Sequence, residues 1–311
     1  MSRILNIIGL HNVNSSWCFP MREGAGVRGL ERMLRALARA GTPMPLDDAL
    51  GRLDSGGGLP RGAFCVTFDD GYADNLSLAA PLLERLGVSA TFFLVPDLLS
   101  RETTAWWERL GWAFVNARSP SVVFEGAGYA LHNDAESRHS YDTLAARLKR
   151  RDCAARERAV DELVELCDPS GRSHVDEMFL DWHGARELSE RGFGIGSHSE
   201  RHRILTQESP AAQAGDLRMS RERLQSQLGV AVDLLAYPNG TAADFDEHTI
   251  AAAKDAGYSY ALTTVMGSNT PDTPPYELRR WVAYPERGVW GLGVIGAQYG
   301  KAKLRRAAER V

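Results

Sequence analysis

The amino-acid sequence predicts an α/β fold built around a parallel sheet, and three observations point to this class. Short apolar or β-branched runs alternate with helical patterns along most of the chain. Early in the chain a strand, a helix and a second strand follow one another within about 30 residues, which is the βαβ unit of a parallel sheet. Of the 311 residues, 44% are hydrophobic and 24% are charged, a globular composition that excludes a disordered or fibrous chain.

The first predicted elements follow from apolar spacing and from the residues that end each run. Residues 4–10 are a short apolar run, interpreted as a buried strand, and residues 27–40 carry leucines at helical spacing. Residues 63–68 form the next strand, which is stopped by an Asp-Asp-Gly turn. A helix over residues 74–86, ended by a glycine, leads into a third strand over residues 88–95.

Residues from about 100 to 175 have a different character, and we interpret them as a largely helical insertion. The segment contains three tryptophans near its start, a hairpin around residues 125–128 and two charged helices over residues 141–149 and 154–166. Its polar composition favours an insertion that packs on the rest of the fold and has no core of its own.

The alternation of strands and helices resumes after the insertion. A helix begins near residue 181, and another begins at residue 210 after a serine cap. The remaining predicted elements are strands over residues 193–197, 232–237 and 258–264 and a helix over residues 247–256. We expect one barrel-type domain over residues 1–290, followed by a helix or tail over residues 291–311.

Charge and composition exclude several classes of partner. The 36 basic and 40 acidic residues give a net charge of −4, so nothing favours a nucleic-acid surface. No apolar run approaches the roughly 18 residues of a membrane span, and we expect no membrane insertion. The four cysteines form no Cys-x-x-Cys pair, and the N-terminal apolar run lacks the flanks of a signal peptide. We therefore predict a cytoplasmic protein, while its oligomeric state stays open.

Two adjacent carboxylates, Asp69 and Asp70, directly follow the predicted strand over residues 63–68. Neighbouring carboxylates repel one another unless a metal ion or a cationic side chain lies nearby. Because successive side chains of an extended segment point in opposite directions, one carboxylate can bind an ion while the other faces a substrate. An ordinary Asp-Asp-Gly turn is the alternative interpretation.

Two histidines, His198 and His202, follow the predicted strand over residues 193–197. Two imidazoles and one carboxylate are a common catalytic metal set that leaves positions for water and a substrate oxygen. Surface histidines beside charged neighbours are the alternative for this spacing alone. Active sites of α/β barrels lie at the carboxyl ends of the strands, where both pairs are expected. Together the two pairs therefore indicate a metal-dependent active site.

Three motifs occur in order along the chain. They are Thr67–Gly71, which reads TFDDG, His198–His202, which reads HSERH, and Tyr237–Gly240, which reads YPNG. In order, spacing and strand context they resemble the motifs of the polysaccharide deacetylases of the NodB-homology class (carbohydrate esterase family 4), over roughly residues 1–285. The resemblance implies a distorted (β/α)7 barrel that holds a divalent metal ion, most often zinc, with cobalt, nickel or manganese as alternatives.

The resemblance also implies a role for individual motif residues. Asp70, His198 and His202 would hold the metal, and Asp69 would act as the general base on the metal-activated water. The backbone N–H of Asn239 would stabilise the tetrahedral oxyanion. The family more often has tyrosine at this last position, but a backbone donor does not depend on the side chain.

Two departures from the family pattern affect catalytic residues. The segment before Pro238 lacks the arginine that orients the base carboxylate in the family, and Arg279 or Arg280 could supply that charge. The chain also lacks a late Leu-x-His strand whose histidine protonates the leaving amine. The segment Ile8–Val13 instead resembles the N-terminal strand of the circularly permuted branch, in which this histidine comes first. His11 is therefore the candidate general acid, and a strand-end histidine without a catalytic role is the alternative.

The resemblance implies a metal-dependent hydrolase that removes an N-acetyl group from an amino-sugar, in a small sugar, a sugar-bearing metabolite or a glycan precursor. Candidates for contact with the substrate are Tyr237, Trp106 and Trp107, although such tryptophans more often pack in a core or lid. A non-sugar hydrolase of cyclic amides or ureides on the same fold is the runner-up. A carbohydrate-binding homologue with weak catalysis is favoured by the missing motif arginine and opposed by the complete Asp-Asp-His-His set.

Overall fold

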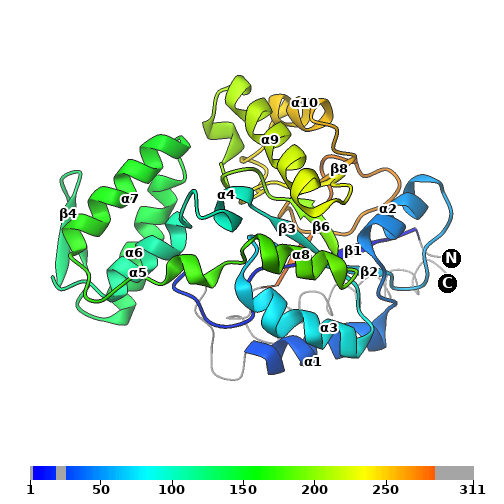
Figure 1. The fold of residues 1–311 in the computed structure, drawn as a ribbon, viewed down its shortest axis with the longest axis horizontal. Coiled ribbons are helices and arrows are strands. Elements are labelled where there is room, and N and C mark those ends of the chain that lie inside the picture. Colours follow the sequence, from blue (N-terminus) through cyan, green and yellow to red (C-terminus); the bar gives the residue numbers. More distant parts are fainter. Residues whose placement is uncertain (1–2, 19–25, 284–311) are drawn as a thin grey trace, which may run out of the picture.

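The computed structural model describes residues 3–18 and 26–283, and a curled parallel sheet lies at its centre with helices around it (Figure 1). In hydrogen-bonded order the seven strands are β8 (Tyr260–Leu262), β7 (Leu234–Ala236), β6 (Gly194–Ser197), β3 (Ala90–Leu94), β2 (Phe64–Phe68), β1 (Asn6–Leu10) and β9 (Trp281–Val282). Every neighbouring pair is parallel, which confirms the predicted α/β class. Within the described ranges, no helix has the length and apolar character needed to cross a membrane.

The segment over residues 275–283 brings the two edges of the sheet together. The Leu278 N–H donates to the Ala261 carbonyl in β8, and the Leu278 carbonyl accepts from the Thr263 N–H. The segment then runs into β9, which pairs with β1. The sheet therefore curls into a distorted barrel, in agreement with the expected fold. The predicted tail over residues 291–311 lies outside the described residues.

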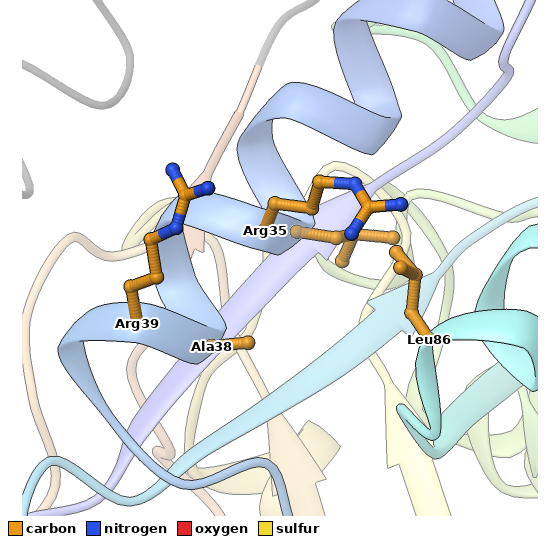
Figure 2. Close-up of a pocket in the computed structure, with 5 residues that line it drawn as sticks. Arg35, Ala38, Arg39 and Leu86 are labelled. Carbon is orange, nitrogen blue, oxygen red and sulfur yellow. The ribbon is translucent and has the colours of Figure 1, made fainter.

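Helices cover the outside of the curled sheet (Figure 1). They are α1 (Gly26–Ala40), α2 (Leu46–Asp54), α3 (Ala80–Leu86), α4 (Pro96–Leu99), α8 (Trp182–Glu190), α9 (Pro210–Leu228) and α10 (Glu247–Asp255). Helices α1 and α3 lie side by side on one side of the sheet, and α9 packs against α10 on another. A groove between α1 and α3 is lined by Leu34, Arg35, Ala38, Arg39 and Leu86 (Figure 2).

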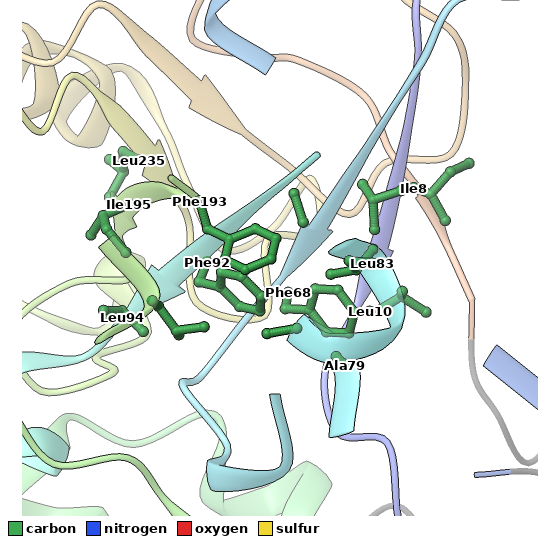
Figure 3. Packing of buried hydrophobic residues seen from close by; sticks show 14 of the residues in the cluster. Ile8, Leu10, Phe68, Ala79, Leu83, Phe92, Leu94, Phe193, Ile195 and Leu235 are labelled. Atoms are coloured by element: carbon green, nitrogen blue, oxygen red, sulfur yellow. The ribbon is translucent and has the colours of Figure 1, made fainter. Parts of the chain in front are cut away.

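The main hydrophobic core lies between the strands and the helices (Figure 3). The rings of Phe68 in β2 and Phe92 in β3 stack with their centroids 5.2 Å apart, and Phe193 meets Phe92 edge-on. Every residue of β1, β2 and β3 is buried, as expected for parallel strands covered on both faces. Strands packed in this way give the residues at their carboxyl ends fixed positions.

The insertion forms a helical lobe at one end of the molecule (Figure 1). Its elements are α5 (Trp106–Val115), β4 (Ser121–Phe124), β5 (Ala127–Ala130), α6 (Asp134–Leu148) and α7 (Cys153–Cys167). The antiparallel pair of β4 and β5 confirms the hairpin expected around residues 125–128. Helix α7 agrees with the helix predicted over residues 154–166.

The expectation that the insertion has no core of its own was wrong. Leu110, Leu144 and Leu163 are fully buried within a hydrophobic cluster formed mainly by residues of the lobe. Tyr72, which follows β2, and Phe179 extend this cluster towards the barrel. The polar residues that suggested a coreless segment lie on the outer faces of amphipathic helices, so composition alone did not reveal the buried face.

Three local differences from the predicted elements have physical causes. Helix α2 lies in a segment for which no element is predicted, and its leucines at helical spacing pack in a smaller core. Helix α6 begins seven residues before the predicted start at residue 141, because the Asn133 side chain accepts from the Glu136 N–H and caps it. The helix predicted over residues 74–86 begins with a π-helical turn, η1 (Asn75–Ala79), before α3.

The close approach of β6 to β3 generates a stability prediction. A Cβ atom at Gly196 would lie 2.4 Å from two atoms of the Phe93 ring and 3.1 Å from the Leu234 carbonyl oxygen. Because the ring is packed in the sheet, we expect Gly196→Ala to lower the free energy of unfolding by about 1–3 kcal/mol. Urea denaturation measures the difference.

Gly215 in α9 is the matched control, because nothing lies within 4 Å of a Cβ atom built there. Gly215→Ala should keep the stability of the protein or raise it by up to about 1 kcal/mol, as alanine is the better helix former. If Gly196→Ala were as stable as Gly215→Ala, the close packing of β3 and β6 would be contradicted.

Candidate active site

The predicted catalytic residues gather at one edge of the curled sheet, where the parallel strands end. Asp69 and Asp70 follow β2, His198 follows β6, and His11 follows β1. The registers align these ends, since β1 pairs with β2, and β3 with β6, up to their last residues. Parallel strands thus deliver side chains that are far apart in the sequence to the same place.

Asp70, His198 and His202 meet in a buried cluster. The Asp70 Oδ1 atom lies 3.3 Å from Nε2 of His198 and 3.3 Å from Nε2 of His202. One possible ligand atom from each residue lies within 4.8 Å of the other two. Across residues 3–18 and 26–283, this is the one group of three or more histidine, cysteine or carboxylate side chains with such a geometry.

The donor atoms of this triad fit a divalent metal ion. The Nδ1 atom of His198 lies 2.7 Å from the Ala236 carbonyl oxygen, which can only accept, so in the neutral ring it is Nε2, facing Asp70, that carries the lone pair. Among the described residues, the buried Asp70 Oδ1 atom has no hydrogen-bond donor. A buried carboxylate oxygen without a donor is costly unless a cation compensates it. Two ring nitrogens and one carboxylate oxygen are a set that zinc and similar divalent ions bind.

The shifted pKa values of Asp70 and His202 also suit a metal. Burial would raise the pKa of Asp70, but the adjacent imidazoles of His198 and His202 hold it well below its usual range. Burial lowers the pKa of His202 to about 4, although Asp70 opposes this shift. Burial likewise opposes the cation of His198, but Asp69 and Asp70 outweigh it and raise its pKa. An ionised Asp70 and a neutral His202 are the forms that bind metal.

The site contains several residues in the left-handed region of backbone conformation. They are Asp70 (φ 72°), Ser199 (φ 63°), His202 (φ 53°) and Asn239 (φ 57°). Only seven non-glycine residues of the described chain have a positive φ, and four of the seven lie in this site. Backbone strain is therefore concentrated here. Such conformations cost about 1–3 kcal/mol each and persist only where the surrounding structure holds them.

Two buried carboxylates, each paired with a half-buried arginine, hold the turn over residues 198–202. The Asp216 carboxylate accepts from the Glu200 N–H at 2.9 Å and pairs with Arg203 at 3.0 Å. The Glu200 carboxylate pairs with Arg223 of α9 at 2.7 Å. Sequence reasoning missed these residues, and no local signal marks them, because their partners are reached only through the packing of α9 on the turn.

Asp69 is held by a buried arginine. Arg280 donates from Nη1 and Nη2 to the two Asp69 carboxylate oxygens, both at 2.7 Å, and from Nε to the Thr263 carbonyl at 2.9 Å. Burial would raise the pKa of Asp69, but the charge and hydrogen bonds of Arg280 hold it below its usual range. Of the two candidate arginines, Arg280 reaches Asp69, whereas Arg279 is exposed and its backbone bonds Asn269.

His11 lies at the end of β1, beside the carboxylate pair. Its backbone carbonyl accepts from the Asn75 side chain at 2.8 Å. Burial lowers the pKa of His11, while the charges of Asp70 and Asp69 act in the opposite direction. The structure therefore brings His11 close enough to both carboxylates to sense their charge.

Asn239 offers a backbone donor in the turn after β7. Its carbonyl accepts from the Thr264 hydroxyl at 2.7 Å, and this bond helps to hold the left-handed turn. Within the described part of the chain, its own N–H donates no hydrogen bond to another backbone group or to a side chain. An uncommitted N–H is what the predicted oxyanion role requires.

The aromatic candidates for substrate contact are buried. Tyr237 is 0% exposed, its ring stacks on Phe245, and its hydroxyl donates to the Tyr276 carbonyl. Trp106 and Trp107 are 7% and 5% exposed in the core of the lobe. Because the three side chains are buried, the structure gives no support to the prediction that they bind a sugar through an open ring face.

Trp107 instead packs against a residue of the triad. Its ring centroid lies 4.3 Å from that of His202, and its indole N–H donates to the Tyr72 hydroxyl at 2.9 Å. The insertion therefore forms one wall of the candidate site. The groove between α1 and α3 contains none of the predicted site residues (Figure 2).

The pairing of Asp69 with Arg280 generates a prediction. Arg280→Ala leaves a buried carboxylate without its partner, so we expect the free energy of unfolding at pH 7 to fall by about 3–5 kcal/mol in urea denaturation. The difference in the free energy of unfolding between the wild type and Arg280→Ala should become smaller as the pH falls. The wild-type Asp69, whose pKa is lowered, loses its stabilising contribution on protonation, whereas protonation relieves the unpaired charge of the variant.

Arg279→Ala is the matched control, because Arg279 is the exposed neighbour of the same segment. It should change the free energy of unfolding by less than about 0.5 kcal/mol. Equal stability of the two variants at pH 7 would show that Asp69 does not depend on Arg280.

Most of the chain is similar in sequence to part of a curated protein. The curated relative YxkH of Bacillus subtilis is 20% identical over 235 residues, which are 76% of this chain and 54% of that protein. The chain therefore spans about half the length of the curated relative that it matches.

Solved structures show the same fold at low sequence identity. The deacetylase PplD of Streptococcus pyogenes, solved in complex with acetate, matches with a TM-score of 0.61 at 16% identity, over 93% of this chain and 96% of that one. The deacetylase domain of BpsB from Bordetella bronchiseptica matches with a TM-score of 0.57 at 16% identity, over 90% and 96% of the two chains. IcaB from Ammonifex degensii matches with a TM-score of 0.57 at 17% identity, over 92% and 94%.

The sequence pattern of one known family extends over most of the barrel. Residues 57–261 match the family described as polysaccharide deacetylase, which is more than half of the 311 residues. This match includes the carboxylates after β2 and the histidines after β6, whose side chains form the buried triad. The chain belongs to the polysaccharide deacetylase family.

Proposed function

We propose that this protein is a metal-dependent hydrolase that removes the N-acetyl group from an amino-sugar. The observation that carries the proposal is the buried triad of Asp70, His198 and His202 beside the carboxylate of Asp69, in a member of the polysaccharide deacetylase family. A divalent cation bound by the triad, for which we propose zinc before cobalt, nickel or manganese, would supply Lewis-acid polarisation and lower the pKa of water.

Asp69 acts in this proposal as the general base. Arg280 keeps its carboxylate ionised and fixes the direction of both oxygens. The carboxylate takes a proton from the attacking water while the new bond to the acetyl carbon forms. A base held by two parallel hydrogen bonds loses little orientational freedom during the reaction.

Asn239 and His11 stabilise the other two charges that develop in the reaction, one on the acetyl oxygen and one on the leaving nitrogen. The Asn239 N–H donates to the oxyanion that develops on the acetyl oxygen. His11 donates a proton to the sugar nitrogen as the C–N bond breaks, so that acetate and a free amine leave. An acid histidine directly after the first strand, ahead of the base motif, supports a place in the circularly permuted branch of the family.

For the substrate we propose a small acetylated amino-sugar, a sugar-bearing metabolite or a glycan precursor. This choice depends on the proposed cytoplasmic location, where an exported polymer is not accessible. In support of that location, the four cysteines are all free thiols, and Cys65, Cys153 and Cys167 are buried.

Release of acetate tests the proposed reaction. We expect the metal-loaded protein to release acetate from at least one compound in a panel of N-acetylated monosaccharides, nucleotide sugars and amino-sugar oligomers, as detected by an enzyme-coupled acetate assay. Turnover of cyclic amides or ureides without acetate release would favour the non-sugar hydrolase. Binding of the sugars without turnover of any compound would favour the carbohydrate-binding homologue.

Metal content and turnover together separate the ligands from the base. We expect about one equivalent of divalent metal in the wild-type protein by elemental analysis, and a large loss of it in His198→Ala. Asp69→Asn should keep the metal and lose at least about 100-fold in kcat, because it removes the proton acceptor.

Unchanged metal content in His198→Ala would refute the ligand assignment. An active Asp69→Asn enzyme would remove Asp69 from the role of base. Thr249→Val, which alters a buried hydroxyl of α10 outside the site, is the control and should change neither readout.

A further inference from the structure

The loop after β1 carries His11, and its described residues 11–18 are held by buried polar side chains. Asn75, the first residue of η1, is 0% exposed, and its Nδ2 atom donates to the His11 carbonyl at 2.8 Å. The same Nδ2 atom lies 3.2 Å from the Asp74 Oδ1 atom. A neutral amide that donates both hydrogens in a buried place is held in one orientation.

Two carboxylates hold the rest of this loop. The Asp74 Oδ2 atom accepts from the N–H groups of Val13 and Asn14 at 2.9 Å and 2.7 Å. Glu108 of the insertion accepts from the Cys18 N–H at 3.1 Å and, through its other oxygen, from the Tyr72 hydroxyl at 2.7 Å. These bonds hold Val13, Asn14 and Cys18 independently of Asn75, whose side-chain amide contacts the backbone of His11 itself.

The π-helical turn accounts for the position of Asn75. The sequence predicts a helix over residues 74–86, but its first turn, η1, is π-helical and only the rest is α-helical. Turns of this kind are rare, and they are frequent at functional sites. Here the turn places Asn75 beneath the carbonyl of His11 and next to the segment that leads from Asp69 and Asp70.

We propose that Asn75 is a positioning residue that fixes His11 for transfer of a proton to the leaving amine. The hydrogen bond to the His11 carbonyl sets where the Cα atom of His11 lies at the end of β1, and thereby where its ring can reach. Asn75 does not touch the substrate in this proposal, since its side chain is buried. The inference rests on the proposed function, in which His11 is the general acid.

The test uses two substrates that differ in their need for an acid. An N-acetyl amide leaves as an amine and needs a proton, whereas an aryl acetate such as 4-nitrophenyl acetate leaves as a stabilised phenolate and does not. His11→Ala should lower kcat for the amide by at least about 100-fold and leave aryl acetate hydrolysis within about twofold. Asn75→Ala should show the same selectivity, with a loss in kcat for the amide of at least about tenfold.

A double-mutant cycle on the amide substrate separates positioning from general damage. In the His11→Ala background, Asn75→Ala should cause no further loss, because it acts only through His11. The isosteric variant Asn75→Asp, which replaces the donor by an acceptor opposite the His11 carbonyl, repeats the measurement if Asn75→Ala does not fold. Thr249→Val is the control for the loss of a buried hydrogen bond outside the site, and it should affect neither substrate.

The possible outcomes distinguish the positioning role of Asn75 from the acid role of His11. Equal losses for amide and aryl acetate in Asn75→Ala, or a further loss in the His11→Ala background, would overturn the positioning role while the acid role of His11 remains. Full amide turnover by His11→Ala would overturn the acid role in the proposed function, and the positioning role with it. If the protein does not hydrolyse aryl acetates, the double-mutant cycle on the amide substrate alone tests whether Asn75 acts through His11.

Discussion

The ion pair between Asp69 and Arg280 is the interaction on which the rest of the structure depends. Each charge is buried, so each would be costly without the other, and the two parallel hydrogen bonds compensate both. Asp69 stands at the end of β2 in the middle of the sheet, whereas Arg280 belongs to the segment over residues 275–283 that joins the two sheet edges. The contact that orients the proposed base is therefore also one that fixes the closing of the barrel.

The other candidate catalytic groups depend on packing from outside the barrel strands. The strained turn over residues 198–202 is held by the buried carboxylate of Asp216 and the half-buried guanidinium of Arg223, both in α9. The insertion contributes Trp107, whose ring lies against His202, and Glu108, whose carboxylate holds the loop after His11. We interpret the lobe as a structural wall of the site, because its aromatic side chains support the triad and face into its own core.

Much of the fold could be predicted because its signals are local. Apolar runs, glycines and caps indicated the strands and most helices, and a parallel sheet aligns the carboxyl ends of its strands, which placed Asp69, Asp70 and His198 together. The differences from the predicted fold share a cause. The core of the lobe and the π-helical turn of η1 depend on neighbours distant in sequence, which residue type and spacing do not reveal.

The sequence by itself determined the chemical set: two carboxylates after one strand, two histidines after another, and a family whose motifs share that order. Residue type and position relative to a strand end suffice for this, because they decide which atoms can bind a metal or accept a proton. Only the tertiary structure decided between Arg279 and Arg280, since neighbouring residues of an extended segment point to opposite sides. It also decided the partner of His11, because the amide of Asn75 reaches that carbonyl only once β1 and β2 are paired and η1 has formed.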